Sequence, residues 1–328
     1  MSIFTLLEDK LKKTGVKYRL VFPEGNEQKV LEAASKLAAG SIVEPILLGN
    51  PQKIMTTIRS SKLTYPQPKI IDYQHDSAIS ELVPAFIAAR GKEVAKADVL
   101  RALNDANYYA TMLVKIGKAD GMVSGVAHST ADTVRPALQL IHTAAGMKRV
   151  SGSFIMERGA ERYIFADCAI NPEPDSKTLA EIAYQSVATA RMIDLEPRVA
   201  FLSFSTKGSA KGIMVDRVAE AYQIFAHNHP NILADGELQF DAAFVPEVAR
   251  KKAPTSPLKG RANIFIFPEL QSGNIAYKMT QRLGNFTAIG PILQGIAQPI
   301  NDLSRGASRQ DIYNMAILTA AQVSAEGE

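Results

Sequence analysis

The sequence predicts an α/β protein with two α/β domains, each built on a mostly parallel sheet covered by helices. Strand-like and helix-like segments alternate from near the N-terminus onward, which is the pattern of repeated β-α units. The chain has 328 residues, enough for two domains of ordinary size. Its composition, 46% hydrophobic and 21% charged, is that of a globular protein with a full core.

The first half of the chain supplies three short apolar runs and the helices between them. The runs at 18–22, 44–49 and 121–126 are predicted strands, and the first ends at Pro23. The predicted helices span 1–13, 26–39, 77–90, 96–116 and 129–140.

The second half opens with a predicted antiparallel hairpin, VSGSFIME (150–157) and RYIFADCAI (162–170), joined by RGAE. The stretch 247–262, rich in Lys, Pro and Ser, is predicted to be an exposed loop. Further strands are expected at 198–205, 240–245, 263–267 and 287–289, and helices at 176–193, 214–228, 273–284 and 309–324.

Composition excludes several classes of protein. No stretch offers the roughly 20 apolar residues that a membrane span needs, and the N-terminal segment contains acids unlike a signal peptide. The net charge of +4 is spread along the chain, so no nucleic-acid surface is expected, although a small polyanion would be favoured. The single cysteine, Cys168, permits no internal disulfide, which predicts a reducing, cytoplasmic location.

Several predicted strands end in small, hydroxyl-bearing or glycine residues. In an open parallel sheet, ligands bind beyond the carboxyl ends of the strands, and such residues let backbone N–H groups approach phosphate oxygens. Together they predict a phosphorylated ligand, and none matches a Walker A loop or GxGxxG. The segments are SGVAHSTAD, STKGSAKG, PELQSGN and GPILQG leading to NDLSRG.

The segment HSTADTVRPAL (128–138) has two interpretations. Ser129-x-x-Asp132 is a capping box, so Ser129 fits a plain helix start as well as a ligand contact. Arg135, about one and a half turns into the helix and before the kinking Pro136, can reach an anion at the helix start. In STKGSAKG, Lys207 fits a solvated basic loop equally well.

The segment NDLSRGASRQD (301–311) also combines a cap with unexplained residues. Ser308-x-x-Asp311 is a second capping box before an apolar helix. A cap explains neither Arg305 nor its neighbours Asn301 and Asp302, so the segment is a candidate active site.

The other candidates indicate no chemistry. His227 and His229 end a helix without a nearby Cys or acid cluster, so no metal site is expected. Cys168 lies in an apolar strand and is expected in the core. There is no G-x-S-x-G elbow.

Four long segments together resemble phosphate acetyltransferase (phosphotransacetylase), over nearly the whole chain from FPEG (22–25) onward. The resemblance implies a fold like that of isocitrate and isopropylmalate dehydrogenases, with the active site in a cleft between the domains. It also implies reversible acetyl transfer between coenzyme A and inorganic phosphate. The segments are GKADGMVSGVAHSTADTVRPALQLI, FADCAINPEPDSKTLAEIA, LSFSTKGSAKG and IGPILQGIAQPINDLSRGAS.

The resemblance assigns roles to matching residues. Asp311 falls on the base for the coenzyme A thiol, Arg305 on the residue that holds the acyl phosphate, and Ser304 on its catalytic neighbour. Many relatives carry Cys where this chain has Ala307, which argues against a covalent acyl-cysteine. The substrate-binding residues expected by the same comparison and by the loops above are Ser129, Thr130, Arg135, Arg90 and Lys207.

The expected substrates are therefore acetyl-CoA or coenzyme A, acetyl phosphate and inorganic phosphate, with no tightly bound cofactor and no metal. The resemblance implies a homodimer. The first domain is expected to comprise 1–140 and 297–328, because the last helix must return NDLSRG to the HSTADTVR loop, and the second 141–296. The alternatives are a phosphate butyryltransferase, an NAD-linked hydroxyacid decarboxylating dehydrogenase, for which no aspartate cluster is evident, and a catalytically silent binding domain.

Overall fold

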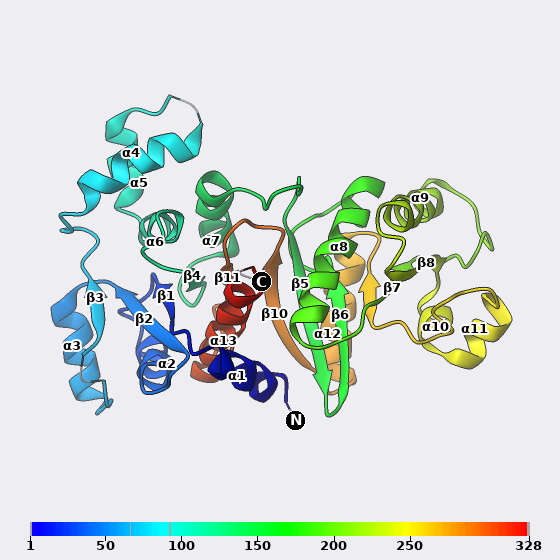
Figure 1. The fold of residues 1–328 in the computed structure, drawn as a ribbon, viewed down its shortest axis with the longest axis horizontal. Coiled ribbons are helices and arrows are strands. Elements are labelled where there is room, and N and C mark those ends of the chain that lie inside the picture. The colour runs from blue at the N-terminus through cyan, green and yellow to red at the C-terminus, as the bar shows by residue number, and fades with distance from the viewer. Residues whose placement is uncertain (1, 66, 92, 327–328) are drawn as a thin grey trace. The chain divides into compact units, whose positions relative to one another are not determined.

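The computed structural model describes residues 2–65, 67–91 and 93–326 of the chain. Within these residues the chain forms two compact units (Figure 1). Unit 1 consists of the first residues and Gly146–Gly295, and unit 2 consists of the segments that begin at Phe4 and at Ile296. The predicted domain limits fall close to these positions, and the domain division itself stays a prediction.

Unit 2 is a five-stranded sheet in which every neighbouring pair of strands is parallel. Its inner strands are mostly apolar, as expected for strands covered on both faces. Leu20, Val21, Ile46 and Met122 are almost completely buried. In sheet order the strands are β11 (Ile300–Asp302), β4 (Gly121–Ser124), β1 (Tyr18–Phe22), β2 (Val43–Leu48) and β3 (Lys69–Ile71).

The helices of unit 2 cover this sheet. α13 packs on α2 and on β1, β2, β4 and β11, while α6 packs on β1 and β4 (Figure 1). Helix starts carry the expected caps: Asn50 precedes Pro51, and Asp105 accepts from the first turn of its helix. The helices are α1 (Ile3–Thr14), α2 (Gln28–Ala38), α3 (Pro51–Ser60), α4 (Ile79–Arg90), α5 (Lys96–Leu103), α6 (Ala106–Lys115), α7 (Thr130–Pro136), the π-helix η1 (Ala137–Ile141) and α13 (Arg309–Glu326).

Unit 1 is a six-stranded mixed sheet. The predicted hairpin is present, because β5 pairs antiparallel with both β6 and β10, whereas the other three pairs are parallel. In sheet order the strands are β10 (Thr287–Gln294), β5 (Ser151–Arg158), β6 (Glu161–Ala166), β9 (Ile264–Ile266), β7 (Arg198–Leu202) and β8 (Leu233–Leu238). The helices are α8 (Ser176–Met192), α9 (Ile213–Asn228), α10 (Phe240–Phe244), α11 (Pro246–Lys252) and α12 (Leu270–Leu283).

The predicted fold class, α/β with mostly parallel sheets, is confirmed, and three local predictions are wrong. The predicted strand 240–245 is mostly helix α10 (Phe240–Phe244), and the strand of that region is β8. The predicted helix 96–116 is two helices, because Asp105 caps a new one. The stretch 247–262 contains helix α11, and Leu258 is buried in the core.

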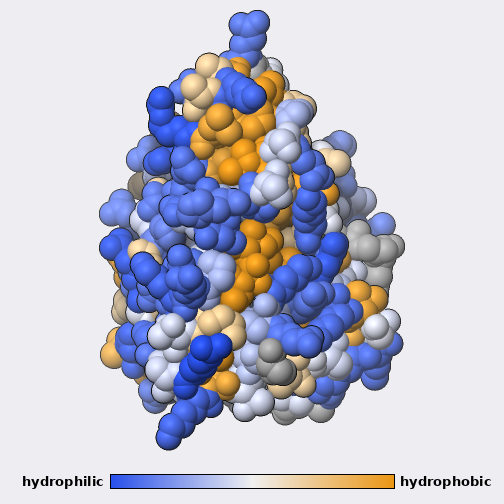
Figure 2. Space-filling model, turned by 90° about the vertical axis from the view of Figure 1, so that its left-hand side faces the viewer, coloured by the Kyte–Doolittle hydropathy of each residue, from blue (hydrophilic) through white to orange (hydrophobic). Residues whose placement is uncertain are grey.

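The side of the molecule that carries α3 and α4 has a mostly hydrophilic surface, with hydrophobic side chains gathered in a narrow band (Figure 2). This agrees with the amphipathic pattern of α3, whose buried residues are Ile54 and Ile58. Among the described residues, no helix combines the length and the apolar character that spanning a bilayer requires.

Candidate active site

The carboxyl ends of the parallel strands in unit 2 meet at one edge of the sheet. β4 lies between β1 and β11, so the loops that follow these three strands are neighbours. The β4–α7 loop (125–129) carries Ser129, and the β11–α13 loop (303–308) carries Ser304 and Arg305. The fold therefore brings the two predicted site segments to the edge at which open parallel sheets bind ligands.

Ser129 is the N-cap of α7. Its hydroxyl donates to Asp132 Oδ2 at 2.6 Å, and its backbone N–H donates to the same oxygen at 3.0 Å. The hydrogen bond from Ser129 lowers the pKa of the Asp132 carboxyl. The cap predicted from the sequence is confirmed, and the substrate-binding role of Ser129 stays a prediction.

Thr130 joins the two loops. Its hydroxyl donates to Asp302 Oδ2 at 2.6 Å, and Asp302, the last residue of β11, is buried. Burial raises the pKa of the Asp302 carboxyl, and the hydrogen bond from Thr130 offsets this only in part. Because the one hydroxyl proton of Thr130 is held by Asp302, that hydroxyl can accept but cannot donate to a ligand while Asp302 is ionised.

Gly125 allows the close approach of the same two loops. Its φ of +106° lies in the region that favours glycine, and an added Cβ would meet Leu303 O at 2.4 Å. The N–H of Leu303 donates to Ser124 O at 2.7 Å, which continues the β4–β11 pairing past the strand end.

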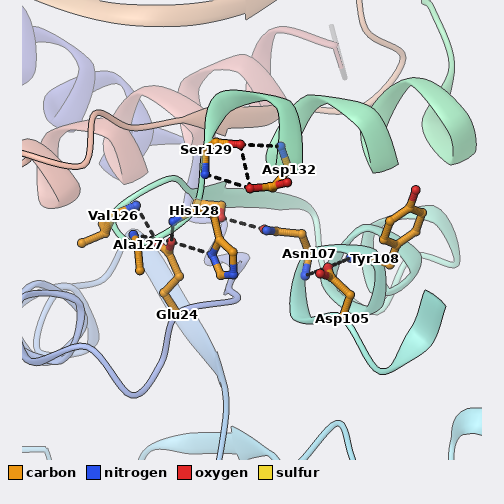
Figure 3. A network of polar contacts seen from close by, with 10 residues as sticks. Glu24, Asp105, Asn107, Tyr108, Val126, Ala127, His128, Ser129 and Asp132 are labelled. Carbon is orange, nitrogen blue, oxygen red and sulfur yellow. Dashed lines mark hydrogen bonds and ion pairs between the residues drawn. The ribbon is translucent and has the colours of Figure 1, made fainter. Parts of the chain in front are cut away.

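Three backbone N–H groups of the β4–α7 loop are held by a protein carboxylate, and the prediction that such loops approach phosphate oxygens stays a prediction. The N–H groups of Val126, Ala127 and His128 donate to the carboxylate of Glu24, at 2.9, 2.7 and 3.0 Å (Figure 3). A protein carboxylate from the end of β1 thus occupies the position expected for a phosphate.

Arg90 and Arg135 both act electrostatically on the Tyr108 hydroxyl. Burial raises the pKa of the Tyr108 hydroxyl, and the positive charges of Arg135 and Arg90 act in the opposite direction. Tyr108 donates to Gln139 Oε1 at 2.8 Å. Neither arginine forms an ion pair with any of the described residues, so both guanidinium groups are available to an anion.

The β11–α13 loop is a tight turn that leaves Arg305 exposed. Ala307 N–H donates to Ser304 O at 2.8 Å, and Lys29 from α2 donates to Ala307 O at 3.1 Å. Arg305 has no ion-pair partner among the residues that the structure describes. A guanidinium in this setting matches the oxygens of a phosphate.

Asp311 closes the capping box of α13. Ser308 donates to Asp311 Oδ2 through its N–H and through its hydroxyl, both at 2.8 Å. The N–H of Asp311 donates back to Ser308 Oγ at 3.2 Å. The predicted cap is confirmed, and because both bonds that Asp311 accepts from described residues use Oδ2, Oδ1 remains for other chemistry.

Lys207 belongs to unit 1, where its ammonium group contacts the buried carboxylate of Asp235 and donates to Gly236 O at 3.0 Å. It also lies 5.1 Å from the ring centroid of Tyr222. These contacts give Lys207 a clear structural role, and its substrate-binding role stays a prediction.

The side chains expected to be inert have ordinary surroundings. Cys168 is buried in the core of unit 1, and burial raises the pKa of its thiol well above the ordinary value. His229 stacks on Tyr184 at 4.2 Å between ring centroids. Over the described part of the chain, no group of three His, Cys, Asp or Glu side chains is arranged to hold a metal ion.

Sequence reasoning missed Glu24 and left Asp302 without a role. The available signal was weak: each is an acidic residue at the end of a buried strand. Their partners lie more than 100 residues away along the chain.

Fold and site together define an α/β protein that presents unpaired arginines and capped helix starts at the carboxyl edge of a parallel sheet, a class suited to phosphorylated anions. The model of the family described as "Phosphate acetyl/butaryl transferase" matches residues 4–320. The chain belongs to this family, as its resemblance predicted.

Relatives of known name match over almost their full length. A phosphate acetyltransferase of Bacillus subtilis is 54% identical over 321 residues, which are 98% of this chain and 99% of that protein. A phosphotransacetylase structure from Streptococcus pyogenes has a TM-score of 0.96 at 50% identity, covering 99% of both chains. The structure titled EutD phosphotransacetylase from Staphylococcus aureus has a TM-score of 0.92 at 48% identity, covering 98% of both chains.

The fold extends beyond this group. A 4-hydroxythreonine-4-phosphate dehydrogenase from Burkholderia phymatum has a TM-score of 0.52 at 12% identity, covering 95% of this chain and 98% of that one. This likeness concerns the fold alone, and it agrees with the dehydrogenase-like fold expected from the sequence.

Proposed function

We propose that this protein is a phosphate acetyltransferase, which moves an acetyl group reversibly between coenzyme A and inorganic phosphate. Full-length relatives at about half identity carry this name, in agreement with the function predicted from the sequence. The observation that carries the proposal is the meeting of the Ser129–Thr130 and Ser304–Arg305 segments at one sheet edge, joined by the Thr130–Asp302 hydrogen bond.

Arg305 is the residue we assign to the reacting phosphate. Its exposed, unpaired guanidinium can bind two phosphate oxygens and stabilise the charge that develops on phosphate as it leaves the acetyl group. We assign Ser304 to a hydrogen bond at the same phosphoryl group, because its hydroxyl lies in the exposed part of the turn beside Arg305.

Asp311 is the residue we assign to the thiol proton. In the proposed step the sulfur of coenzyme A attacks the acetyl carbon of acetyl phosphate, the C–S bond forms and the C–O bond to phosphate breaks. The thiol proton passes to Asp311 and from there to solvent or the departing phosphate. The thiolate is the nucleophile, so a carboxylate with one uncommitted oxygen near the thiol serves this step.

The remaining predicted residues are proposed to hold the anionic parts of the substrates. Arg90 and Arg135 supply two positive charges that act on Tyr108, and the hydroxyls of Ser129 and Thr130 donate to substrate oxygens once they turn away from Asp132 and Asp302. Lys207 is proposed to contribute from unit 1. We further propose that the enzyme is a cytoplasmic homodimer, that coenzyme A is a substrate, and that no cofactor is tightly bound.

The test is a spectrophotometric assay of free thiol after the protein is mixed with acetyl-CoA and phosphate. We expect phosphate-dependent release of coenzyme A and formation of acetyl phosphate. Arg305→Ala should lose most of this turnover, and Arg59→Ala, which removes an exposed arginine on α3, is the matched control. Faster turnover of butyryl-CoA than of acetyl-CoA, or no phosphate-dependent release at all, would contradict the proposal.

A further inference from the structure

Glu24 is a buried carboxylate that no step of the proposed reaction uses. It follows β1 directly after Pro23, and only 2% of its side chain is exposed. Burial alone would raise the pKa of Glu24, but the hydrogen bonds from His128 and from the backbone outweigh it, and the pKa is lowered. Glu24 is therefore a charged group kept inside the protein, which requires a local reason.

The reason is visible in its donors (Figure 3). Three consecutive N–H groups, from Val126 to His128, point at the two carboxylate oxygens, and His128 Nδ1 lies 2.8 Å from Oε1. Consecutive N–H groups that converge on one point are an anion-binding arrangement, the kind that other proteins offer to phosphate. Here the anion is the protein's own side chain.

The occupied arrangement fixes the loop that leads into α7. The segment 126–128 is held by Glu24 from the β1 side, and the next turn is held by the Thr130–Asp302 hydrogen bond from the β11 side. Without the carboxylate, three backbone donors would lose their partner, and the loop would rearrange to satisfy them.

We infer that Glu24 is a positioning residue of the proposed active site: as an internal anion it holds residues 126–128 so that the start of α7 faces the phosphate-bearing substrate. The inference rests on the proposed function. It assigns Glu24 no contact with substrate, because its oxygens are directed at the loop N–H groups.

A pocket makes the role of the charge testable. Glu24 and His128 line a pocket of about 250 Å³ together with Tyr73 and Asp105. If Glu24 is shortened to alanine, a small carboxylate from solution can enter through this pocket and take the vacated position. Formate, the smallest carboxylate, is the probe.

A matched control exists at the other end of β4. Asp120 precedes this strand, accepts from Arg19 N–H at 2.7 Å and binds the Arg19 guanidinium, so it also holds one strand to its neighbour. Among the described residues, Asp120 forms no hydrogen bond or ion pair with the β4–α7 loop. If the loss of activity in a Glu24 variant came only from a weakened β4, Asp120→Ala should show the same loss.

The experiment measures KM and kcat for acetyl phosphate and phosphate in Glu24→Ala, with formate or an equal concentration of chloride. We expect KM to rise by on the order of tenfold to a hundredfold, with a smaller loss of kcat, because the loop is misplaced rather than the reacting groups removed. Formate should bring KM most of the way back down to the wild-type value, and chloride should not. The KM of Asp120→Ala should stay within about twofold of the wild-type value and should not change when formate is added.

Hydrogen exchange of the backbone N–H groups in 124–131 reports on the loop without any reaction. We expect fast exchange in Glu24→Ala and renewed protection with formate; Glu24→Gln, which keeps the volume and loses the charge, should exchange faster than wild type and not respond to formate. An unchanged KM in folded Glu24→Ala, or exchange that neither speeds up nor responds to formate, would overturn the inference. If the wild-type protein released no thiol, the proposed function would fail. Hydrogen exchange would still show whether Glu24 holds residues 126–128, because it does not depend on turnover.

Discussion

Asp311 caps α13, and its proposed role as base for the thiol can be separated from the cap by two substitutions. Asp311→Asn keeps an oxygen that accepts from the N–H and hydroxyl of Ser308, but the amide cannot take a proton from the thiol. Ser308→Ala leaves the Asp311 carboxylate in place and removes the hydroxyl that takes part in two of the three hydrogen bonds of the box.

The geometry sets the expected magnitudes. Loss of a serine cap costs about 1 kcal/mol of stability, so Ser308→Ala should lower the melting temperature by about 2–4 °C. Its turnover should fall by no more than about fivefold, the factor that corresponds to the same energy. Asp311→Asn should lose less stability, yet its turnover should fall by roughly 10²–10⁴-fold if the carboxylate is the base.

The assay is thiol release at saturating substrate, measured from pH 6.5 to 9 beside thermal unfolding. Because a free thiol has a pKa of about 8.5, solution supplies more thiolate as the pH rises, and Asp311→Asn should recover part of its turnover. The reasoning is refuted if Asp311→Asn keeps near-normal turnover, or if Ser308→Ala loses as much turnover as Asp311→Asn does.

Three further predictions concern the loop of β4 and its surroundings. Arg135→Ala should raise KM for coenzyme A or acetyl phosphate by about 10–150-fold, since a charge-assisted hydrogen bond contributes about 1.5–3 kcal/mol. The melting temperature should not change. An unchanged KM for both substrates would show that Arg135 does not bind them. Gly125→Ala should cost about 1–3 kcal/mol from its φ alone and more from the contact with the β11 loop. Gly117→Ala, also at positive φ but in open space, should cost less in urea unfolding. The hydrogen bond to Glu24 raises the pKa of His128 above 6.5. The stability that protonated His128 contributes is therefore complete below pH 6.5 and is lost as the pH rises through the raised pKa. In His128→Gln, the melting temperature should depend less on pH between pH 6 and 9.

The sequence was sufficient for the elements whose apolar pattern is long or bounded by clear caps. The strand at 18–22 and the helix at 176–193 were predicted almost residue for residue, since one is a short, mostly apolar run ending at Pro23 and the other begins beside Asp175. The segment 240–245 was mistaken for a strand, because a five-residue apolar helix and a short buried strand have the same appearance in sequence.

For the candidate site, sequence supplied the residue types and the structure supplied their partners. Both capping boxes are local, three residues apart, and both were predicted. Glu24 accepts hydrogen bonds from residues that lie 102–104 positions away along the chain, and no local sequence pattern encodes these bonds. The contact of Lys207 with Asp235 likewise depends on how β7 and β8 lie side by side.

The sheet order of unit 2 also has a consequence for biosynthesis. β11 and α13 are translated after every other element of that unit, with the whole of residues 146–295 in between. Until they emerge, β4 has a neighbour on one side only, and the apolar surfaces of β1, β2 and α2 that α13 covers stay bare. The nascent chain thus carries an unpaired strand edge and an uncovered apolar face while unit 1 is being made, which is the condition under which chains aggregate or engage chaperones. Ribosome pausing within 146–295 should therefore lower the yield of folded enzyme, because it prolongs this exposed state before β11 and α13 complete the sheet and deliver Arg305 and Asp311.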